Sequence, residues 1–258
     1  MDQKLTIVKV GGKVLESPET LHDFLEDFSA LPGPKVLVHG GGRSATTMAK
    51  RLGIETKMVE GRRITDEDML EVVTMVYGGL VNKTVVAGLQ AMDINAMGIT
   101  GADLNLIKAH KRTGSDVDYG FVGDVDEVNI SPVIPLLKQG IVPVIAPLTH
   151  DGQGTLLNTN ADTIASSLAV GFSEVMETRL MFCFEKPGVL INPDDDTSVI
   201  PFLNRELFNM YRNEGIISEG MVPKLENGFD SLANGVAEVV ITNTEGLSVP
   251  GSGTTLGE

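Results

Sequence analysis

Several apolar runs in this chain show no alternation of polar and apolar residues, and this feature constrains the fold most strongly. Two of them are Val142-Pro143-Val144-Ile145 and Val239-Val240-Ile241. A strand with one face in water alternates, whereas a strand covered on both faces is apolar throughout. Segments with helical spacing of apolar residues, such as residues 17–30, lie between the runs. The pattern predicts an α/β fold: a three-layer αβα sandwich with a mainly parallel, open central sheet.

The same patterns predict the order of the elements. Strands are predicted at residues 5–10, 35–39, 95–99, 141–146, 180–184, 189–191 and 237–242. Helices are predicted at residues 17–30, 44–52, 66–77, 81–92, 132–137, 160–170, 204–210 and 224–233. We expect Gly78-Gly79 to separate two helices, because glycine interrupts helical segments. We expect residues 253–256 to add a short edge strand.

Length, charge and cysteine content limit the class of protein. The 258 residues suit one large α/β domain or two closely joined lobes; if there are two, we expect them at residues 1–172 and 173–258 on one continuous sheet. The 20 basic and 35 acidic residues give a formal net charge of −15, so we expect no nucleic-acid or anionic-membrane partner. The single cysteine, Cys183, excludes a disulfide within one chain. With no signal peptide and no apolar run of membrane-spanning length, we expect a cytoplasmic protein.

The first predicted strand carries a lysine and ends at two glycines, in the order Val8-Lys9-Val10-Gly11-Gly12. A lysine in an apolar strand is costly unless a charged group lies beside it. Glycines let a backbone approach a ligand closely. A second cluster, Gly40-Gly41-Gly42, follows the next strand. Because ligands bind at the carboxyl ends of parallel strands, the two clusters predict an anion site, and we infer a phosphoryl group.

Other glycine motifs do not match these residues. The chain has no G-x-x-x-x-G-K-[ST] sequence, so it is not a P-loop protein. It has no G-x-G-x-x-G after the first strand, and His39 closes the second strand where a dinucleotide-binding domain has an acidic residue. It also lacks the G-x-S-x-G of esterases. We interpret His39 as a hydrogen-bonding residue at a strand end.

Several segments together resemble the amino acid kinase family and, within it, the acetylglutamate kinases. The segments are Val8-Lys9-Val10-Gly11-Gly12, Val38-His39-Gly40-Gly41-Gly42, Gly61-Arg62-Arg63-Ile64-Thr65, Gly120-Phe121-Val122-Gly123-Asp124-Val125, Asn158-Thr159-Asn160-Ala161-Asp162, Gly220-Met221 with Lys224, and Gly253-Thr254. The resemblance runs in register over nearly the whole chain. It implies an open αβα sandwich whose N-terminal lobe binds an N-acyl-L-glutamate and whose C-terminal lobe binds ATP. The implied reaction is phosphorylation of the γ-carboxylate of N-acetyl-L-glutamate in arginine biosynthesis.

The resemblance also implies the roles of particular residues. Lys9 and Lys224 match the lysines that stabilise the transition state, and Asp162 matches the aspartate that orients them. The implied substrate-binding residues are Gly41, Gly42, Arg63, Asn158 and Asn160. Gly11 and Gly12 are expected to bind phosphate. The reaction class implies Mg²⁺ on the nucleotide phosphates, and we assign it no protein ligand.

Several alternatives stay open. N-succinyl-L-glutamate is an alternative substrate, because Lys13, Arg43 or Arg62 would suit a second carboxylate. The other hypotheses are another amino acid kinase (glutamate 5-kinase, carbamate kinase or aspartokinase) and a non-catalytic metabolite sensor on this fold. A Rossmann oxidoreductase is a more distant hypothesis. Glu185 and Lys186 depart from the family pattern, so the resemblance assigns no nucleotide contacts to residues 184–189. The resemblance also implies that members inhibited by arginine carry an extra N-terminal helix before the first strand. Because the first strand here begins near residue 5, we expect a homodimer without feedback inhibition by arginine.

Overall fold

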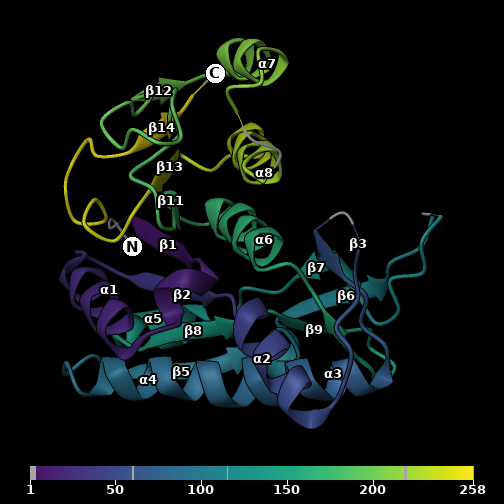
Figure 1. Ribbon diagram of the computed structural model, residues 1–258. Coiled ribbons are helices and arrows are strands. Elements are labelled where there is room, and N and C mark those ends of the chain that lie inside the picture. The colour runs from purple at the N-terminus through teal and green to yellow at the C-terminus, as the bar shows by residue number, and fades with distance from the viewer. Residues whose placement is uncertain (1–3, 60, 115, 218–219, 258) are drawn as a thin grey trace.

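A single mixed sheet forms the centre of the computed structural model, which describes residues 4–59, 61–114, 116–217 and 220–257. Its strands are β1 (Leu5–Val10), β2 (Lys35–His39), β5 (Ala96–Thr100), β8 (Val142–Ala146), β11 (Thr178–Cys183), β12 (Phe202–Leu203), β13 (Glu238–Thr242) and β14 (Thr254–Leu256). They lie in the order β12-β14-β13-β11-β1-β2-β8-β5 (Figure 1). All neighbours are parallel except β13 and β14. The prediction of an open, mainly parallel sheet is therefore confirmed.

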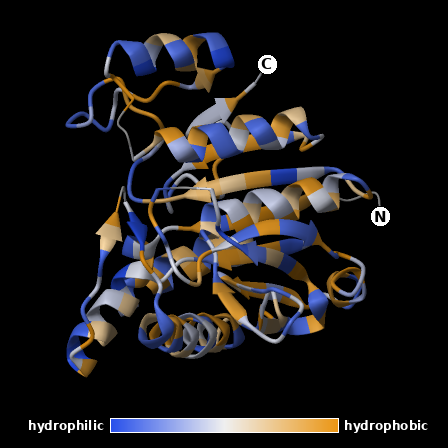
Figure 2. Cartoon of the chain, turned by 90° about the vertical axis from the view of Figure 1, so that its right-hand side faces the viewer, coloured by the Kyte–Doolittle hydropathy of each residue, from blue (hydrophilic) through white to orange (hydrophobic). Residues whose placement is uncertain are grey.

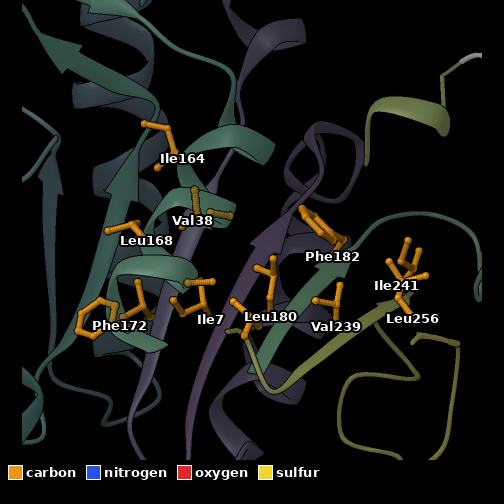
Figure 3. Close-up of a cluster of buried hydrophobic side chains, with 14 of the residues drawn as sticks. Ile7, Val38, Ile164, Leu168, Phe172, Leu180, Phe182, Val239, Ile241 and Leu256 are labelled. Carbon is orange, nitrogen blue, oxygen red and sulfur yellow. The ribbon is translucent and has the colours of Figure 1, made fainter. Parts of the chain in front are cut away.

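Helices cover both faces of this sheet. Helices α1 (Pro18–Ala30) and α4 (Asn82–Gln90) pack on one face, where Phe24 and Leu89 join the strand residue Val8 in one buried cluster. Helices α6 (Ala161–Ser173) and α8 (Val222–Ala233) pack on the other. Figure 3 shows part of this second cluster, in which side chains of α6 lie against β1, β2 and β11. The helices carry hydrophobic and hydrophilic residues in bands, as expected for elements with one buried face (Figure 2).

The side chains of β1 alternate between the two cores. Leu5 and Ile7 belong to the cluster under α6, whereas Val8 and Val10 belong to the cluster under α1. Because side chains of a strand point alternately to opposite faces, Lys9 lies on the face that α6 covers. β1 also pairs with a parallel strand on each side, β2 and β11, so the sheet is continuous across the expected boundary at residue 172. The division of labour between the two lobes stays a prediction.

A smaller mixed sheet, antiparallel except where β6 meets β9, extends from one end of the molecule. It contains β6 (Ile107–Lys111), β7 (Gly123–Val128), β9 (Leu148–His150) and β10 (Leu156–Asn158), in the order β10-β9-β6-β7. The strands β3 (Met58–Val59) and β4 (Arg62–Arg63) form a separate hairpin. The remaining helices are α2 (Gly42–Leu52), α3 (Glu67–Val73), α5 (Ile134–Lys138) and α7 (Arg205–Asn213). The 3-10 turns are Gly12–Leu15 and Asp103–Asn105.

The helix break predicted at Gly78-Gly79 is wrong. α3 continues through a π-helical segment, Thr74–Val81, directly into α4, which gives one helix over Glu67–Gln90. These 24 residues make it the one described helix that is long and apolar enough to cross a membrane, contrary to the expectation from sequence. Its inner side is buried in the protein, including Val72, Val76 and Val85, which is the arrangement of a core helix.

Two predictions for the C-terminal part also change. β14 is not an edge strand, because it lies between β13 and β12. The strand expected at residues 189–191 is reduced to a single bridge between Leu190 and Val199. The position of β14 depends on its pairing with β12, a segment far away in the chain, which local patterns do not report.

Candidate active site

A cavity of about 580 Å³ opens at the carboxyl ends of β1, β2 and β11. Its walls come from the segments that follow these strands and from the first turn of α8. They are lined by Lys9, Gly11, Gly12, Lys13, the cluster Gly40 to Gly42, Arg43, residues 184–186, Gly188, Val189, Leu190, Pro193, Ile216, Ile217, Gly220, Met221 and Lys224. This is the edge of an α/β sheet where ligands bind.

Lys9, Asp162 and Lys224 meet at this cavity. Lys9 Nζ lies 2.7 Å from Asp162 Oδ1, and Lys224 Nζ lies 3.1 Å from Asp162 Oδ2. The side chains of Lys9 and Asp162 are each 10% exposed, and that of Lys224 is 25% exposed. The three residues come from β1, α6 and α8. Two ammonium groups share one carboxylate, so the cluster carries a net positive charge.

Asp162 stays ionised in this cluster. Burial alone would raise the pKa of its carboxyl, but the charges and hydrogen bonds of Lys9 and Lys224 outweigh burial and hold the pKa below its usual value. Asp162 also lies in the first turn of α6, where the helix dipole favours a negative charge. The carboxylate therefore fixes both ammonium groups without neutralising them.

The glycine clusters present backbone amides to the cavity, with two exceptions, Gly11 and Gly40; the N–H of Gly40 donates to the Val10 carbonyl at 3.3 Å. Gly12 begins a 3-10 turn and Gly42 begins α2, so their N–H groups have no preceding carbonyl of their own helix to bond. The N–H of Gly11 differs from the expectation of a free amide, because it donates to the Cys183 carbonyl at 2.8 Å. Gly11 thereby ties β1 to β11 at the cavity edge.

Gly41 must be glycine because another element approaches it. A Cβ atom at this position would lie 2.7 Å from a ring atom of Tyr77, in the π-helical segment. Tyr77 is 5% exposed and packs in the cluster that contains Ala45. The long helix therefore fixes the position of the loop between β2 and α2.

Arg63 is a buried guanidinium, 9% exposed, and no described carboxylate lies within ion-pair distance of it. Its Nη2 donates to the Gly42 carbonyl at 2.8 Å and to Thr46 Oγ1 at 2.9 Å. Among the described residues, Arg63 therefore forms no surface salt bridge that would give it a purely structural role. A buried cation that has neutral partners only is suited to an anionic ligand.

Asn158 is the last residue of β10, and Asn160 lies two residues later, immediately before α6. Asn158 Nδ2 donates to Thr65 Oγ1 at 2.9 Å, which joins β10 to the segment after Arg63. Asn160 Oδ1 accepts from the N–H groups of Asp162 and Thr163, at 2.7 and 3.2 Å. Asn160 is thus the N-cap of α6. Neither asparagine lines the cavity itself, and neither does Arg63.

The divergent segment 184–189 forms one wall of the cavity. Glu185 pairs with Lys13 at 2.5 Å across the opening, and Lys186 pairs with Asp196 at 2.9 Å, which holds the following loop. No motif in the sequence indicated the Lys13–Glu185 pair. Little indicated the apolar wall formed by Val189, Leu190, Pro193, Ile216, Ile217 and Met221. Only the apolar pair Ile216-Ile217 beside the Gly220-Met221 motif could have pointed to it.

The described residues contain no group of three His, Cys, Asp or Glu side chains with the spacing of a metal site. Both oxygens of Asp162 already face lysines, and Glu185 faces Lys13. Mg²⁺ commonly binds through few protein carboxylates and several phosphate and water oxygens. These residues fit an ion that arrives on phosphates and do not form a cage of their own.

Comparison with known proteins agrees with this geometry. The model of the amino acid kinase family matches residues 4–243. Acetylglutamate kinase from Phocaeicola vulgatus is 58% identical over 256 residues, 99% of each chain. The enzyme of that name from Parabacteroides distasonis is 60% identical over 240 residues, 93% of this chain and 94% of the relative.

A solved structure gives the same result for the fold. N-acetylglutamate synthase from Neisseria gonorrhoeae, complexed with coenzyme A and N-acetyl-glutamate, has a TM-score of 0.84 at 20% identity, over 99% of this chain and 59% of that one. At this identity the likeness concerns the fold alone. The family model and the full-length relatives lead to one assignment: the chain belongs to the amino acid kinase family.

Proposed function

We propose that this protein transfers the γ-phosphoryl group of ATP to the γ-carboxylate of N-acetyl-L-glutamate, a step of arginine biosynthesis. Full-length relatives named acetylglutamate kinase, 58% and 60% identical, support the reaction. The structural observation that carries the proposal is the cluster of Lys9, Asp162 and Lys224 beside two glycine loops. A non-catalytic sensor has no need for two cations held in this way.

The chemistry requires charge stabilisation and no general base. A carboxylate with an ordinary pKa of about 4.3 is already ionised at neutral pH, so it is the nucleophile as it stands. The obstacle is the repulsion between this anion and the phosphates of ATP. Transfer of the phosphoryl group therefore depends on positioning and on stabilising the charge that develops on its oxygens.

Each residue of the cluster has a place in this scheme. Lys9 is the more buried lysine and lies at the end of β1, where we assign it to the transferring phosphoryl group. Lys224 is more exposed and belongs to α8, and we assign it to the leaving side, toward the nucleotide. Asp162 holds both ammonium groups in place. The N–H groups of Gly12, Gly41 and Gly42 donate to phosphoryl oxygens, and Gly11 positions this loop.

The substrate is held on the side of Arg63. The Arg63 guanidinium binds the α-carboxylate as a bidentate partner, next to Gly42 whose carbonyl it already contacts. Asn158 contacts the N-acyl-L-glutamate from β10, and Asn160 acts mainly by capping α6. The acyl group lies against this side of the cavity, where the N-acetyl and N-succinyl substrates would differ.

The apolar wall of the cavity receives the nucleotide base. Val189, Ile217 and Met221 offer the surface, and they lie in the part of the chain assigned to the C-terminal lobe. Mg²⁺ would be held by the nucleotide phosphates and not by a protein carboxylate, and it would offset their negative charge. The residues 184–189 would shape nucleotide access through the Lys13–Glu185 pair.

The decisive experiment measures ATP-dependent formation of an acyl phosphate, trapped with hydroxylamine. N-acetyl-L-glutamate, N-succinyl-L-glutamate and free L-glutamate are compared under identical conditions. We expect the highest kcat/KM with N-acetyl-L-glutamate and loss of turnover when EDTA removes Mg²⁺. A folded protein that turns over none of the three would exclude the kinase, and a preference for the N-succinyl compound would change the substrate.

We also propose a homodimer in the cytoplasm. Met75 and Leu80 expose large apolar side chains on the outer side of the long helix, and they would be covered by a second copy. Light scattering on the purified protein tests this, with a monomer at micromolar concentration as the contrary result.

A further inference from the structure

A buried polar network lies directly behind the glycine loop of β2. His39 is fully buried at the end of this strand, and Asn82 is 1% exposed at the start of α4. His39 Nε2 lies 3.1 Å from Asn82 Nδ2, and His39 Nδ1 lies 2.7 Å from the Gly40 carbonyl oxygen. None of these contacts belongs to the reaction scheme above.

The partners of Asn82 determine which imidazole nitrogen carries the proton. Asn82 Nδ2 lies 3.0 Å from the Val144 carbonyl, which only accepts, and Asn82 Oδ1 lies 3.1 Å from Lys83 Nζ, which only donates. Both contacts fix the orientation of the amide, so its N–H groups point to Val144 and to His39. His39 Nε2 must then accept. The proton of the neutral ring is on Nδ1, and Nδ1–H donates to the Gly40 carbonyl.

Neutrality of the ring follows from its surroundings. Burial lowers the pKa of His39 to about 4, against the opposing effect of the hydrogen bond to Gly40. The nearby charge of Lys83 lowers the pKa further. At neutral pH the imidazole is therefore uncharged, with one donor and one acceptor, and both are used.

The bond to Gly40 determines the direction of the next amide. In a trans peptide the C=O and N–H groups point in opposite directions. With the Gly40 carbonyl turned inward to His39, the N–H of Gly41 is turned the other way. Gly41 lines the cavity, and the described chain has no cis peptide bond.

We propose that His39, held by Asn82, is a positioning residue that turns the Gly41 N–H toward the transferring phosphoryl group. The inference rests on the proposed kinase reaction. His39 touches neither substrate nor nucleotide in this scheme, and it acts through the Gly40–Gly41 peptide. We expect a misdirected Gly41 N–H to lower kcat more than it weakens substrate binding, because the charge on the phosphoryl oxygens develops in the transition state.

Two features of the fold hold Asn82 in this role. The π-helical segment Thr74–Val81 ends immediately before Asn82 and sets the register that turns this side chain toward the sheet. Gly98 on β5 leaves room for it, because a Cβ there would lie 1.8 Å from Asn82 Oδ1. A long helix and two strands thus converge on one imidazole.

Two substitutions separate positioning from packing. The amide nitrogen of an asparagine side chain takes the place of His Nδ1, whereas the glutamine amide takes the place of Nε2. His39→Asn keeps a donor for Gly40, and His39→Gln keeps only a partner for Asn82. We expect kcat of His39→Asn within about threefold of the parent protein and kcat of His39→Gln lower by about tenfold or more, since outright loss of such a donor costs roughly 10² to 10³. KM values for both substrates should change less than about threefold.

The control is Phe24→Leu, a core change under α1 on the opposite face from α6. It should lower stability while leaving kcat unchanged. Equal loss of kcat in His39→Asn and His39→Gln would mean that His39 only packs, and the proposal would be overturned. If the parent protein itself shows no turnover, the kinase reaction fails, and a separate measurement decides the inference.

That measurement is ¹⁵N NMR of the histidine ring and of the Gly41 amide. We expect a neutral ring with its proton on Nδ1 from pH 5.5 to 8. We also expect the chemical shift of the Gly41 amide to change in His39→Gln and to stay close to the value of the parent protein in His39→Asn. A proton on Nε2, or a Gly41 signal indifferent to His39→Gln, would refute the inference whatever the activity.

Discussion

Lys9 occupies a position on β1 where an apolar side chain would serve the core equally well. Its neighbours along this face, Leu5 and Ile7, are fully buried. Replacement by methionine fills the same volume and removes the charge, and Asp162 keeps Lys224 as a partner. The residue is therefore retained for its charge at the cavity, and stability and activity should respond differently.

We predict that Lys9→Met lowers kcat by roughly 10² to 10³ and changes the free energy of unfolding by less than about 2 kcal/mol. Hydroxylamine trapping and urea unfolding measure the two effects. Lys4→Met is the matched control, because Lys4 pairs with Glu238 at the other end of β1. An unchanged rate in Lys9→Met would remove Lys9 from the mechanism.

His39 gives the protein a specific pH dependence of stability. Its pKa is about 4 when folded and near 6.5 when unfolded, so the unfolded chain binds more protons between these values. The stability contribution is complete above about pH 6.5 and decreases as the pH falls toward 4. At pH 4.5 the parent protein should have lost about 2.5 kcal/mol that His39→Asn does not lose. Urea midpoints at pH 7.5 and 4.5 test the difference; identical losses in both proteins would contradict it.

At the scale of the element, the start of α6 combines a cap with a functional carboxylate. Asn160 satisfies the N–H groups of Asp162 and Thr163 and so sets the position from which Asp162 reaches the two lysines. An N-cap residue is worth about 1 kcal/mol over alanine. The cap and the proposed contact with substrate make different demands on this side chain.

We predict that Asn160→Ala lowers the free energy of unfolding by about 1 kcal/mol, whereas Asn160→Ser retains most of it. If capping is the main role, Asn160→Ser also keeps the KM for N-acetyl-L-glutamate within about twofold. A rise of tenfold in KM with unchanged stability would instead place Asn160 in direct contact with the substrate.

Elements whose evidence is local could be predicted from the sequence. The apolar runs at β2 and β8 needed no partner to be recognised. The cap of α1 is equally local, since Ser17 Oγ accepts from the Thr20 N–H at 3.1 Å. Elements that depend on distant partners could not. The strands β9, β10 and β12 are two or three residues long and exist through pairing alone.

The long helix and the site also contain features that local patterns predict and features that depend on distant parts of the chain. A glycine pair ends a helix on local grounds, but packing against the core carries the helix through Gly78 and Gly79 as a π segment. Among the site residues, the motif indicated Lys9, Asp162 and Lys224 separately, and only the fold shows that one carboxylate joins both lysines. The engaged N–H of Gly11 and the Lys13–Glu185 pair likewise depend on β11 lying beside β1.

At the scale of the whole molecule, the last strand completes the sheet. β14 lies between β13 and β12 and buries Thr254 and Leu256, and Thr254 Oγ1 accepts from the Val189 N–H at 2.8 Å. Removal of this strand would leave β12 unpaired and expose Val239 and Ile241 beneath α8. The end of the chain is therefore part of the core.

We predict that a chain ending after residue 252 loses cooperative unfolding or its Tm falls by more than 10 °C, an estimate from about 2–4 °C per kcal/mol for a chain of this size. Calorimetry measures this. The control, a chain ending after Gly257, should unfold like the parent protein. A stable, cooperative protein without residues 253–258 would show that β14 is dispensable.

The order of the three clustered residues along the chain determines when the positive charge forms during synthesis. Lys9 and Asp162 leave the ribosome before Lys224, and without Lys224 their charges cancel within a 2.7 Å pair. A chain that still lacks α8 would therefore have a charge-neutral Lys9–Asp162 pair and would lack the surplus positive charge that we assign to phosphate binding. The positive charge appears only when α8 docks, so the ability to bind phosphates comes with the completed sheet and not before it.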